Sequence, residues 1–273
     1  MNDNENVGWR LAMNKVPGYN NRNTIEKKDH HNHDKEGSIC STCNISRQTP
    51  VNISTKDIER SHIPNSILHI DYDKITFSYK GKDHNEAGNF IPTSDNNFVV
   101  HNGTRYNLAQ FHYHIKSENT IDGKEFDAEI HLVHINPKYN NEVTVTDYGG
   151  RTVKSIDSNQ YLVIGLLLSH KHSNTNLFKG LFDSIHENNH DKCTIDFGDL
   201  KKLSYFYFPG SLTSSPFTST ITWFLSNNII HTNIKLPDEP NDVFPRAHTA
   251  RPIQRQVRDT ALYLIPNTPS NHL

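Results

Sequence analysis

Two stretches in which apolar and polar residues alternate, each carrying histidines, constrain the fold of this chain most. In the first, QFHYH at residues 110–114, the alternation of a β-strand places Gln110, His112 and His114 on one face and two aromatic residues on the other. Two imidazoles two residues apart on one rigid strand can bind a single ion, with Zn–N distances of about 2.0–2.1 Å. The spacing of this stretch therefore suits a metal ion.

The second stretch, DAEIHLVHIN at residues 127–136, shows the same alternation. Glu129, His131 and Val133 fall on one face, and His134 falls on the other with two apolar residues. A neighbouring strand could thus supply a third imidazole beside the first two. Three histidines leave the fourth position of a tetrahedral zinc ion open to water, which is typical of a catalytic rather than a structural site.

Acceptor side chains accompany both histidine stretches. Gln110 lies two residues before His112, on the same face. Glu129 is placed in the same way before His131. A metal-bound imidazole usually donates its second N–H to such an acceptor. One H-x-H pair alone is more often a pair of ordinary surface or core histidines, but a second histidine strand with matched Gln and Glu favours a zinc site.

The chain from Thr49 onward consists of short runs rich in Ile, Val, Tyr and Phe, separated by Gly, Asn and Asp. Such runs predict β-strands. The predicted strands are Ile67–Asp71, Lys74–Tyr79, Asn97–His101, Tyr106–Lys116, Phe126–Ile135, Tyr161–Ser169, Ser204–Phe208 and Ser219–Leu225, with Asn227–Ile230 as an extension of the last. Helices are predicted over Leu177–Asn188 and from His231 to Leu236. We expect a β-dominated domain with peripheral helices.

The charge balance and the apolar runs argue against two classes of partner. The chain of 273 residues has 28 Lys+Arg against 30 Asp+Glu, and its net charge of -2 gives no reason to expect nucleic acid. The longest apolar run, Tyr161–Leu168, is far shorter than the roughly 20 residues of a membrane-spanning helix. We therefore expect no nucleic-acid partner and no membrane span. The oligomeric state is not specified.

The N-terminal sequence and the number of cysteines indicate the cellular compartment in which we expect the protein. Residues 1–20 carry Asp3 and Glu5 where a signal peptide carries positive charge, and they lack an apolar stretch. The 3 cysteines are too few for a disulfide framework and favour a reducing compartment. A cytoplasmic location is therefore expected, with secretion or association with a particle left open.

Residues 1–46 are polar and show no apolar periodicity. One interpretation is a small zinc or copper site, because imidazole and thiolate are common ligands and a C-x-x-C pair forms a chelating turn. Its ligands would be His30, His31, His33, Cys40 and Cys43. The favoured interpretation is a polar arm that lies across the domain through Trp9. We divide the chain into this arm, a main domain over residues 47–262 and a tail over residues 263–273.

Five separated motifs follow one another along the chain: QFHYH at 110–114, SEN at 117–119, AEIHLVH at 128–134, FPGSLTSSP at 208–216 and ITW at 221–223. Together they resemble the α-class carbonic anhydrases. RQTPVNI at 47–53 and ARPIQ at 250–254 resemble two further segments of that family, so the resemblance runs from about Arg47 to Asp259. It implies a mainly β (α+β) fold, with one domain, a large twisted and mostly antiparallel central sheet, and peripheral helices.

The resemblance also implies a catalytic site with one zinc ion per chain. The ligands would be His112, His114 and His131, with Gln110 and Glu129 as orienting acceptors and a backbone carbonyl near Thr249 as the acceptor for His114. The Thr213 hydroxyl would accept a hydrogen bond from zinc-bound hydroxide and donate one to the Glu118 carboxylate. An apolar wall for carbon dioxide would consist of Val133, Val163, Leu212 and Trp223.

The activity that the resemblance implies is that of a sulfonamide-sensitive carbonic anhydrase, a zinc lyase. Such an enzyme carries out the reversible hydration of carbon dioxide to bicarbonate and a proton by zinc-bound hydroxide. His84 is the first candidate for the proton shuttle and His101 the second, since imidazole titrates near pH ~6.5. The alternative is a catalytically silent binding or adhesion module. Silent relatives usually lack one of the histidines, which here are all present.

Several positions depart from the family pattern or mark its turns. Asn119 stands where many members have His, and this difference is expected to loosen a buried hydrogen-bond network. By resemblance, cis peptide bonds are expected at Ser215–Pro216 and, as a second candidate, at Thr49–Pro50. The late charge cluster is interpreted as an anchor rather than a binding patch; it comprises Arg251, Arg255 and Arg258.

Overall fold

The computed structural model describes residues 48–56, 58, 68–80, 89–139, 143–146, 152–155, 160–170, 192–213, 219–232, 251–254 and 263–265. Several predicted features lie outside these residues: the 1–46 arm, His84, the helix over Leu177–Asn188, Thr249, the Ser215–Pro216 bond, Arg255 and Arg258. Within the described residues the helices are two short 3-10 turns, η1 (Pro137–Tyr139) and η2 (Gly198–Lys202). None of the described helices is long and apolar enough to span a membrane.

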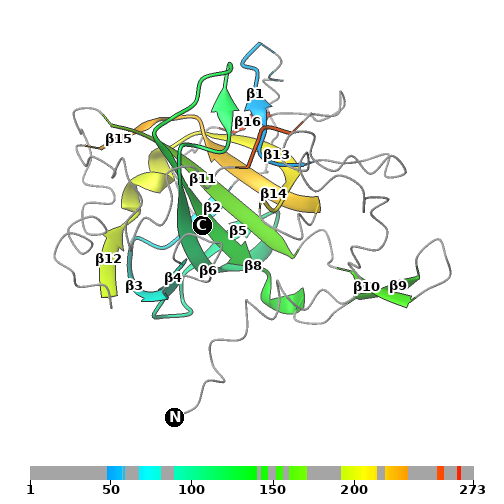
Figure 1. Ribbon diagram of the computed structural model, residues 1–273. Helices are drawn as coiled ribbons and strands as arrows, with labels where there is room; N and C mark the ends of the chain where they lie inside the picture. Colours follow the sequence, from blue (N-terminus) through cyan, green and yellow to red (C-terminus); the bar gives the residue numbers. More distant parts are fainter. Residues whose placement is uncertain are drawn as a thin grey trace.

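The described residues contain one large curled sheet of 12 strands (Figure 1). Its strands are β2 (Leu68–Asp71), β3 (Lys74–Lys80), β4 (Asn89–Pro92), β5 (Phe98–His101), β6 (Thr104–Ile115), β8 (Ala128–Ile135), β11 (Tyr161–His170), β12 (Lys192–Asp196), β13 (Tyr205–Ser211), β14 (Ser219–Ser226), β15 (Ile230–Thr232) and β16 (Tyr263–Ile265). The main path runs β12-β3-β4-β6-β8-β11-β14-β13-β16, and β2, β5 and β15 pair off this path.

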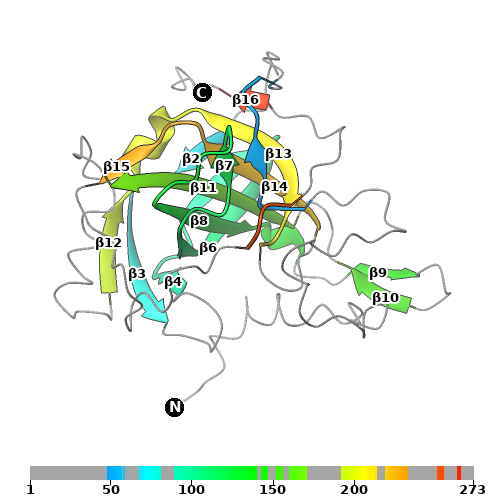
Figure 2. The ribbon, with the colours of Figure 1, turned by 45° about the horizontal axis from the view of Figure 1, so that its top comes forward.

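Two smaller sheets accompany the large one. In the first, β1 (Asn52–Ile53) pairs in parallel with β7 (Thr120–Ile121). In the second, β9 (Val143–Thr146) pairs antiparallel with β10 (Thr152–Ser155), and this hairpin projects from the main sheet in both views (Figures 1 and 2). Within the large sheet only the pairs β11–β14 and β11–β15 are parallel among the described strands. The mostly antiparallel, curled sheet confirms the predicted fold class.

The central strands of the sheet are buried on both faces. Strand β8, AEIHLVHI, is buried at every position except Ile135. Its alternate residues enter two separate apolar clusters, because successive side chains of a strand point to opposite faces. The larger cluster includes Phe77, Phe111, Tyr113, Ile130, Leu132 and Phe224. The smaller cluster includes Val133, Val163, Phe206, Phe208, Leu212 and Trp223. The histidine-bearing face is therefore the face of the smaller cluster.

A β-bulge lies in β6, just before the first histidine stretch. Leu108 is opposite His134 of β8, but Gln110 is opposite Val133, so Ala109 is an extra residue on β6. Leu108 consequently packs in the larger cluster, while Gln110 belongs to the opposite face. Beyond the bulge the alternation is regular, which confirms the predicted common face of the QFHYH stretch.

Two predictions for the end of the strand-rich region are wrong. Asn227–Ile230 does not extend β14, because the chain bends and starts the separate strand β15 at Ile230. The helix predicted from His231 to Leu236 does not begin at His231, which lies in β15 and pairs in parallel with β11; residues 233–236 lie outside the described residues. The reason is that β14 pairs with β11 only at Leu162–Gly165. The backbone N–H and C=O groups at the end of β11 can therefore pair with another strand.

The first and last described segments bear on two further predictions. Thr49 and Pro50 are linked by a cis peptide bond, which confirms the second of the two expected positions. At the other end, β16 pairs with β13, although it follows the predicted domain boundary at residue 262. The boundaries of the arm, the domain and the tail themselves stay predictions.

Candidate metal centre

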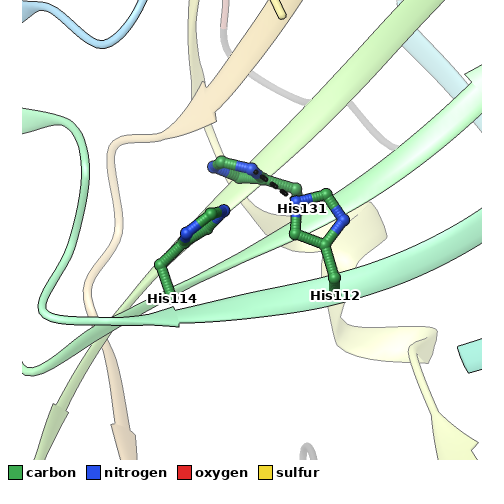
Figure 3. Close-up of side chains that lie close together, drawn as sticks. All are labelled: His112, His114 and His131. Carbon is green, nitrogen blue, oxygen red and sulfur yellow. Dashed lines mark hydrogen bonds between the residues drawn. The ribbon is translucent and has the colours of Figure 1, made fainter. Parts of the chain in front are cut away.

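Three imidazoles from two adjacent strands converge on one point (Figure 3). His112 and His114 come from β6, and His131 lies directly opposite His112 on β8. One ring nitrogen of each residue lies within 4.8 Å of the others. Among the described residues this is the one cluster of histidine, cysteine or carboxylate side chains with metal-binding spacing. The pairing of β6 with β8 thus brings together the three histidines that the resemblance implied as ligands.

The hydrogen bonds of the rings decide which nitrogens face the centre. The His112 Nδ1 atom lies 3.0 Å from the Gln110 Oε1 atom, and the His131 Nε2 atom lies 2.9 Å from the Glu129 Oε1 atom. Both oxygens are acceptors, so each holds a ring N–H. The opposite nitrogens, His112 Nε2 and His131 Nδ1, then carry lone pairs and face each other at 3.3 Å. When both rings are neutral, these lone pairs repel each other, and a cation between them would turn the contact into a favourable one, so the donor set fits zinc.

A buried carboxylate lies beside the histidines. The Glu118 Oε2 atom is 3.4 Å from the His114 Nε2 atom and 3.9 Å from the His131 Nδ1 atom. Burial raises the pKa of Glu118 to about 7, although His131, the Arg251 backbone N–H and a hydrogen bond from the Thr213 side chain each lower it. The Arg251 N–H donates to the other carboxylate oxygen at 2.8 Å. The predicted pair of Thr213 and Glu118 is therefore in contact.

The electrostatics of the imidazoles follow from burial and from neighbouring charge. Burial and the adjacent His131 hold the pKa of His112 well below its usual value. Burial also opposes a charged His131, but the Glu129 and Glu118 carboxylates outweigh it and raise the pKa of that imidazole. His112 is therefore neutral at pH 7, which is the form of imidazole that binds a metal ion.

The four residues of the predicted apolar wall all belong to the smaller cluster. Val133, Val163, Leu212 and Trp223 are at most 5% exposed. The Trp223 ring stands edge-on to the His131 ring, with 4.9 Å between the centroids. Val163 is directly opposite Val133 on the neighbouring strand. The sheet thus places an apolar surface against the histidines.

Of the two candidates for the proton shuttle, only His101 lies within the described residues, and it is not beside the three histidines. His84 lies outside the described residues. His101 does not fit the role, because its ring packs against Phe224 and Tyr207 on the face of the larger cluster. Burial lowers the pKa of His101 to about 4, so it stays neutral in the pH range in which a shuttle must titrate.

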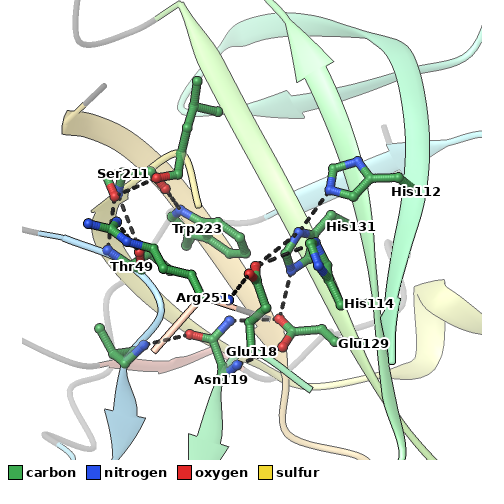
Figure 4. A network of polar contacts seen from close by, with 12 residues as sticks. Thr49, His112, His114, Glu118, Asn119, Glu129, His131, Ser211, Trp223 and Arg251 are labelled. Carbon is green, nitrogen blue, oxygen red and sulfur yellow. Dashed lines mark hydrogen bonds and ion pairs between the residues drawn. The ribbon is translucent and has the colours of Figure 1, made fainter. Parts of the chain in front are cut away.

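The network around the site contains residues whose roles the sequence did not predict (Figure 4). Asn119 was expected to loosen the buried network, and that expectation is wrong: its side chain donates to Glu129 at 2.6 Å and accepts from the Val51 N–H at 2.8 Å. Thr49 and Ser211 exchange two hydrogen bonds of 2.9 Å, each from a backbone N–H to a side-chain oxygen. Their partners are distant in sequence, so no local pattern indicates them.

Arg251 anchors the C-terminal part of the site, as the sequence predicted. Its guanidinium group donates to the Gln48 Oε1 atom at 3.0 Å and to the Thr49 backbone oxygen at 2.7 Å. Its backbone N–H holds Glu118. One residue thus ties the segment that begins at residue 48 to the carboxylate beside the imidazoles.

The chain is similar to known proteins in sequence and in fold. A family model for the eukaryotic-type carbonic anhydrases matches residues 30–261. Alpha carbonic anhydrase 5 of Arabidopsis thaliana is 26% identical over 239 residues, which are 84% of this chain and 78% of that protein.

Two solved structures have the same fold. One is dioscorin complexed with ascorbate, with a TM-score of 0.59 and 16% identity over 82% of this chain and 87% of the other. The other is the alpha-carbonic anhydrase of Thermovibrio ammonificans with the inhibitor sulfanilamide, with a TM-score of 0.56 and 19% identity over 80% of this chain and 86% of the other.

Proposed function

This chain belongs to the eukaryotic-type carbonic anhydrase family, and we propose that it is an active enzyme that reversibly hydrates carbon dioxide to bicarbonate and a proton. The observation that carries the proposal is the convergence of His112, His114 and His131 within 4.8 Å, with acceptors on the outer nitrogens of two of them. A silent binding module has no need of that arrangement.

The three histidines would hold one zinc ion per chain. When bound, zinc lowers the pKa of a water molecule to about 7 and so supplies a nucleophile at neutral pH. Gln110 and Glu129 fix the tautomer and the orientation of His112 and His131, because each accepts the N–H that points away from the centre. His114 completes the set from the same strand face as His112.

Thr213 and Glu118 would orient the attacking water. A hydrogen bond from the Thr213 side chain reaches the Glu118 carboxylate, so the Thr213 hydroxyl proton is directed away from the reacting atoms. The Thr213 hydroxyl oxygen would then accept a hydrogen bond from the O–H group of the nucleophile. A lone pair of the nucleophile's oxygen would consequently point toward the substrate. Arg251 keeps Glu118 in place through its backbone N–H.

The substrate would lie against the apolar wall. Carbon dioxide is small and uncharged, so dispersion contacts with Val133, Val163, Leu212 and Trp223 suit it better than polar groups would. Hydration joins one water to the carbon and releases one proton, which must leave the site. His84 stays our candidate for that transfer, and its replacement by alanine is expected to slow turnover in dilute buffer and to be rescued by imidazole.

The deciding experiment is stopped-flow measurement of carbon dioxide hydration on protein of known zinc content. We expect rapid turnover that is blocked by sulfanilamide, the inhibitor bound in the Thermovibrio ammonificans structure. His112→Ala should lose zinc and activity together, whereas His69→Ala, at an exposed histidine on β2, should keep both. Stoichiometric zinc without turnover in the unmodified protein would contradict the proposal and favour a silent module. A cytoplasmic location stays a prediction.

A further inference from the structure

The Asn119 side chain lies between the metal centre and the segment formed by residues 48–53. Its Nδ2 atom donates to the Glu129 Oε1 atom at 2.6 Å, and its backbone N–H donates to Oε2 of the same carboxylate at 2.7 Å. The Glu129 Oε1 atom is also the acceptor for the His131 ring. The carboxylate thus has three donors, two of which come from Asn119. Asn119 and Glu129 are both 0% exposed.

The other end of the same amide holds the 48–53 segment. Its Oδ1 atom accepts the Val51 backbone N–H at 2.8 Å. The Val51 carbonyl in turn accepts the N–H of Thr120 at 3.1 Å, the residue after Asn119, where β1 pairs with β7. An asparagine amide carries a donor and an acceptor on one short side chain, so it can serve a carboxylate and a backbone N–H at once. If the amide were reversed, its oxygen would face the Glu129 carboxylate, and its NH2 group would face the Val51 N–H. Two acceptors would then oppose each other on one side and two donors on the other.

We propose that Asn119 is a positioning residue that aligns Glu129 for His131 and couples zinc binding to the docking of residues 48–53. Zinc fixes the His131 ring, the ring fixes Glu129, and Glu129 fixes the amide whose oxygen holds Val51. Because coupling is reciprocal, a docked segment raises zinc affinity and bound zinc stabilises the docked segment. The inference rests on the proposed zinc site but not on turnover.

Two substitutions separate the functions of the amide. Asn119→Asp keeps an acceptor for Val51 but replaces the donor with a second carboxylate facing Glu129. Asn119→Leu removes both hydrogen bonds at similar size. The matched control is Asn136→Asp, because Asn136 is 1% exposed at the end of β8 and uses its side-chain oxygen to accept the Lys138 N–H, which aspartate can also do.

The first test measures zinc affinity by competition with a chelating dye, together with the visible absorption of the cobalt-substituted protein. Both Asn119 variants should bind zinc about 10-fold more weakly, the lower end of the range for partners of metal-bound histidines. Their cobalt spectrum should change as well, since the His131 ring is less fixed. Asn136→Asp should match the unmodified protein. Equal affinity and an unchanged spectrum in folded Asn119 variants would overturn the proposal.

The second test begins with the unmodified protein, and this part does not depend on the folding of a variant. Zinc should slow backbone hydrogen exchange in the peptide that contains Val51, by at least about threefold, and this protection should be lost in Asn119→Leu. Unchanged exchange on zinc addition would overturn the proposal. Protein that binds zinc but does not hydrate carbon dioxide would contradict only the proposed activity, whereas a protein that binds no zinc would contradict both.

Discussion

The buried histidines differ in their hydrogen-bond partners and therefore in their protonation. His112 and His131 have an acceptor for one nitrogen and face the centre with the other. His101 instead packs against aromatic rings, and its Nε2 atom contacts only the Asn102 side chain at 3.1 Å, while Nδ1 has no hydrogen-bond partner among the described residues. Burial makes His101 a neutral core residue, and its pKa of about 4 makes the fold sensitive to acid.

We predict that His101→Leu makes the metal-free protein less sensitive to acid. The folded pKa of about 4 lies below the ordinary 6.5, so the unfolded chain binds the proton more readily between these values. The contribution of neutral His101 to stability is therefore fully present above pH 6.5 and is lost as the pH falls toward 4. Denaturant unfolding at pH 7 and pH 5 should show a smaller loss of free energy in the variant.

Metal-free protein is needed for this comparison because zinc binding is itself dependent on pH. The matched control is His69→Leu on the neighbouring strand β2, where the histidine is exposed. An equal loss of stability in His101→Leu and in the unmodified protein would contradict the prediction.

At the level of the strands, the close packing of β8, β11 and β14 depends on one glycine. Gly165 lies directly opposite His131, and a Cβ atom there would be 3.0 Å from the Glu129 Oε1 atom and 2.8 Å from the Leu225 Cδ1 atom. Leu225 is buried in the smaller cluster, so it has little room to move. The glycine leaves the space in which the carboxylate holds His131.

Gly165→Ala should therefore destabilise the protein by about 1–3 kcal/mol and weaken zinc binding, because the new methyl group displaces Glu129. Leu166→Val, at the next position of β11 but on the opposite face, should destabilise the fold without changing zinc affinity. The measurements are denaturant unfolding of the metal-free protein and dye competition for zinc. Zinc affinity equal to that of the unmodified protein in Gly165→Ala would show that the carboxylate tolerates the methyl group.

The strands also show what a sequence reveals and what it does not. The period of two along QFHYH is a local property, so it predicted the common face of His112 and His114. His131 was identified as the third member through the family resemblance, because pairing between strands is not a local property. The bulge at Ala109 has no such signal, because it depends on the register with β8. The residues of β15 were predicted partly as an extension of β14 and partly as the start of a helix. That prediction failed because β15 pairs with the end of β11, which β14 leaves uncovered, and this pairing has no local signal. The Asn119 bridge joins residues 68 apart in sequence.

For the whole molecule, the proposed zinc site makes stability dependent on free zinc. An ion that binds only the folded protein adds about 1.4 kcal/mol for each tenfold rise in its concentration above the dissociation constant. The melting temperature should therefore fall on chelation and recover with zinc. In His131→Ala, which lacks a ligand from β8, the melting temperature should not respond to zinc. A response that persists in this variant would place the stabilising ion elsewhere.

The metal content of the whole chain tests the predicted N-terminal arm. If residues 1–46 form an inert arm, zinc counting should give one ion per chain, and Cys40→Ser with Cys43→Ser should leave that number unchanged. Two ions per chain, reduced to one by the serine substitutions, would instead support the zinc or copper site. Elemental analysis of dialysed protein provides the count.

The positions of the metal ligands in the chain bear on the order of folding. His112 and His131 are only 19 residues apart and lie on one antiparallel pair of strands. The contact between Thr49 and Ser211, by contrast, closes a loop of 162 residues. Since closing a long loop costs more entropy, short-range pairs form earlier. A nascent chain that has emerged as far as Ile135 therefore already contains all three histidines, so we expect the strand pair that carries them to form before the second half of the sheet is synthesised.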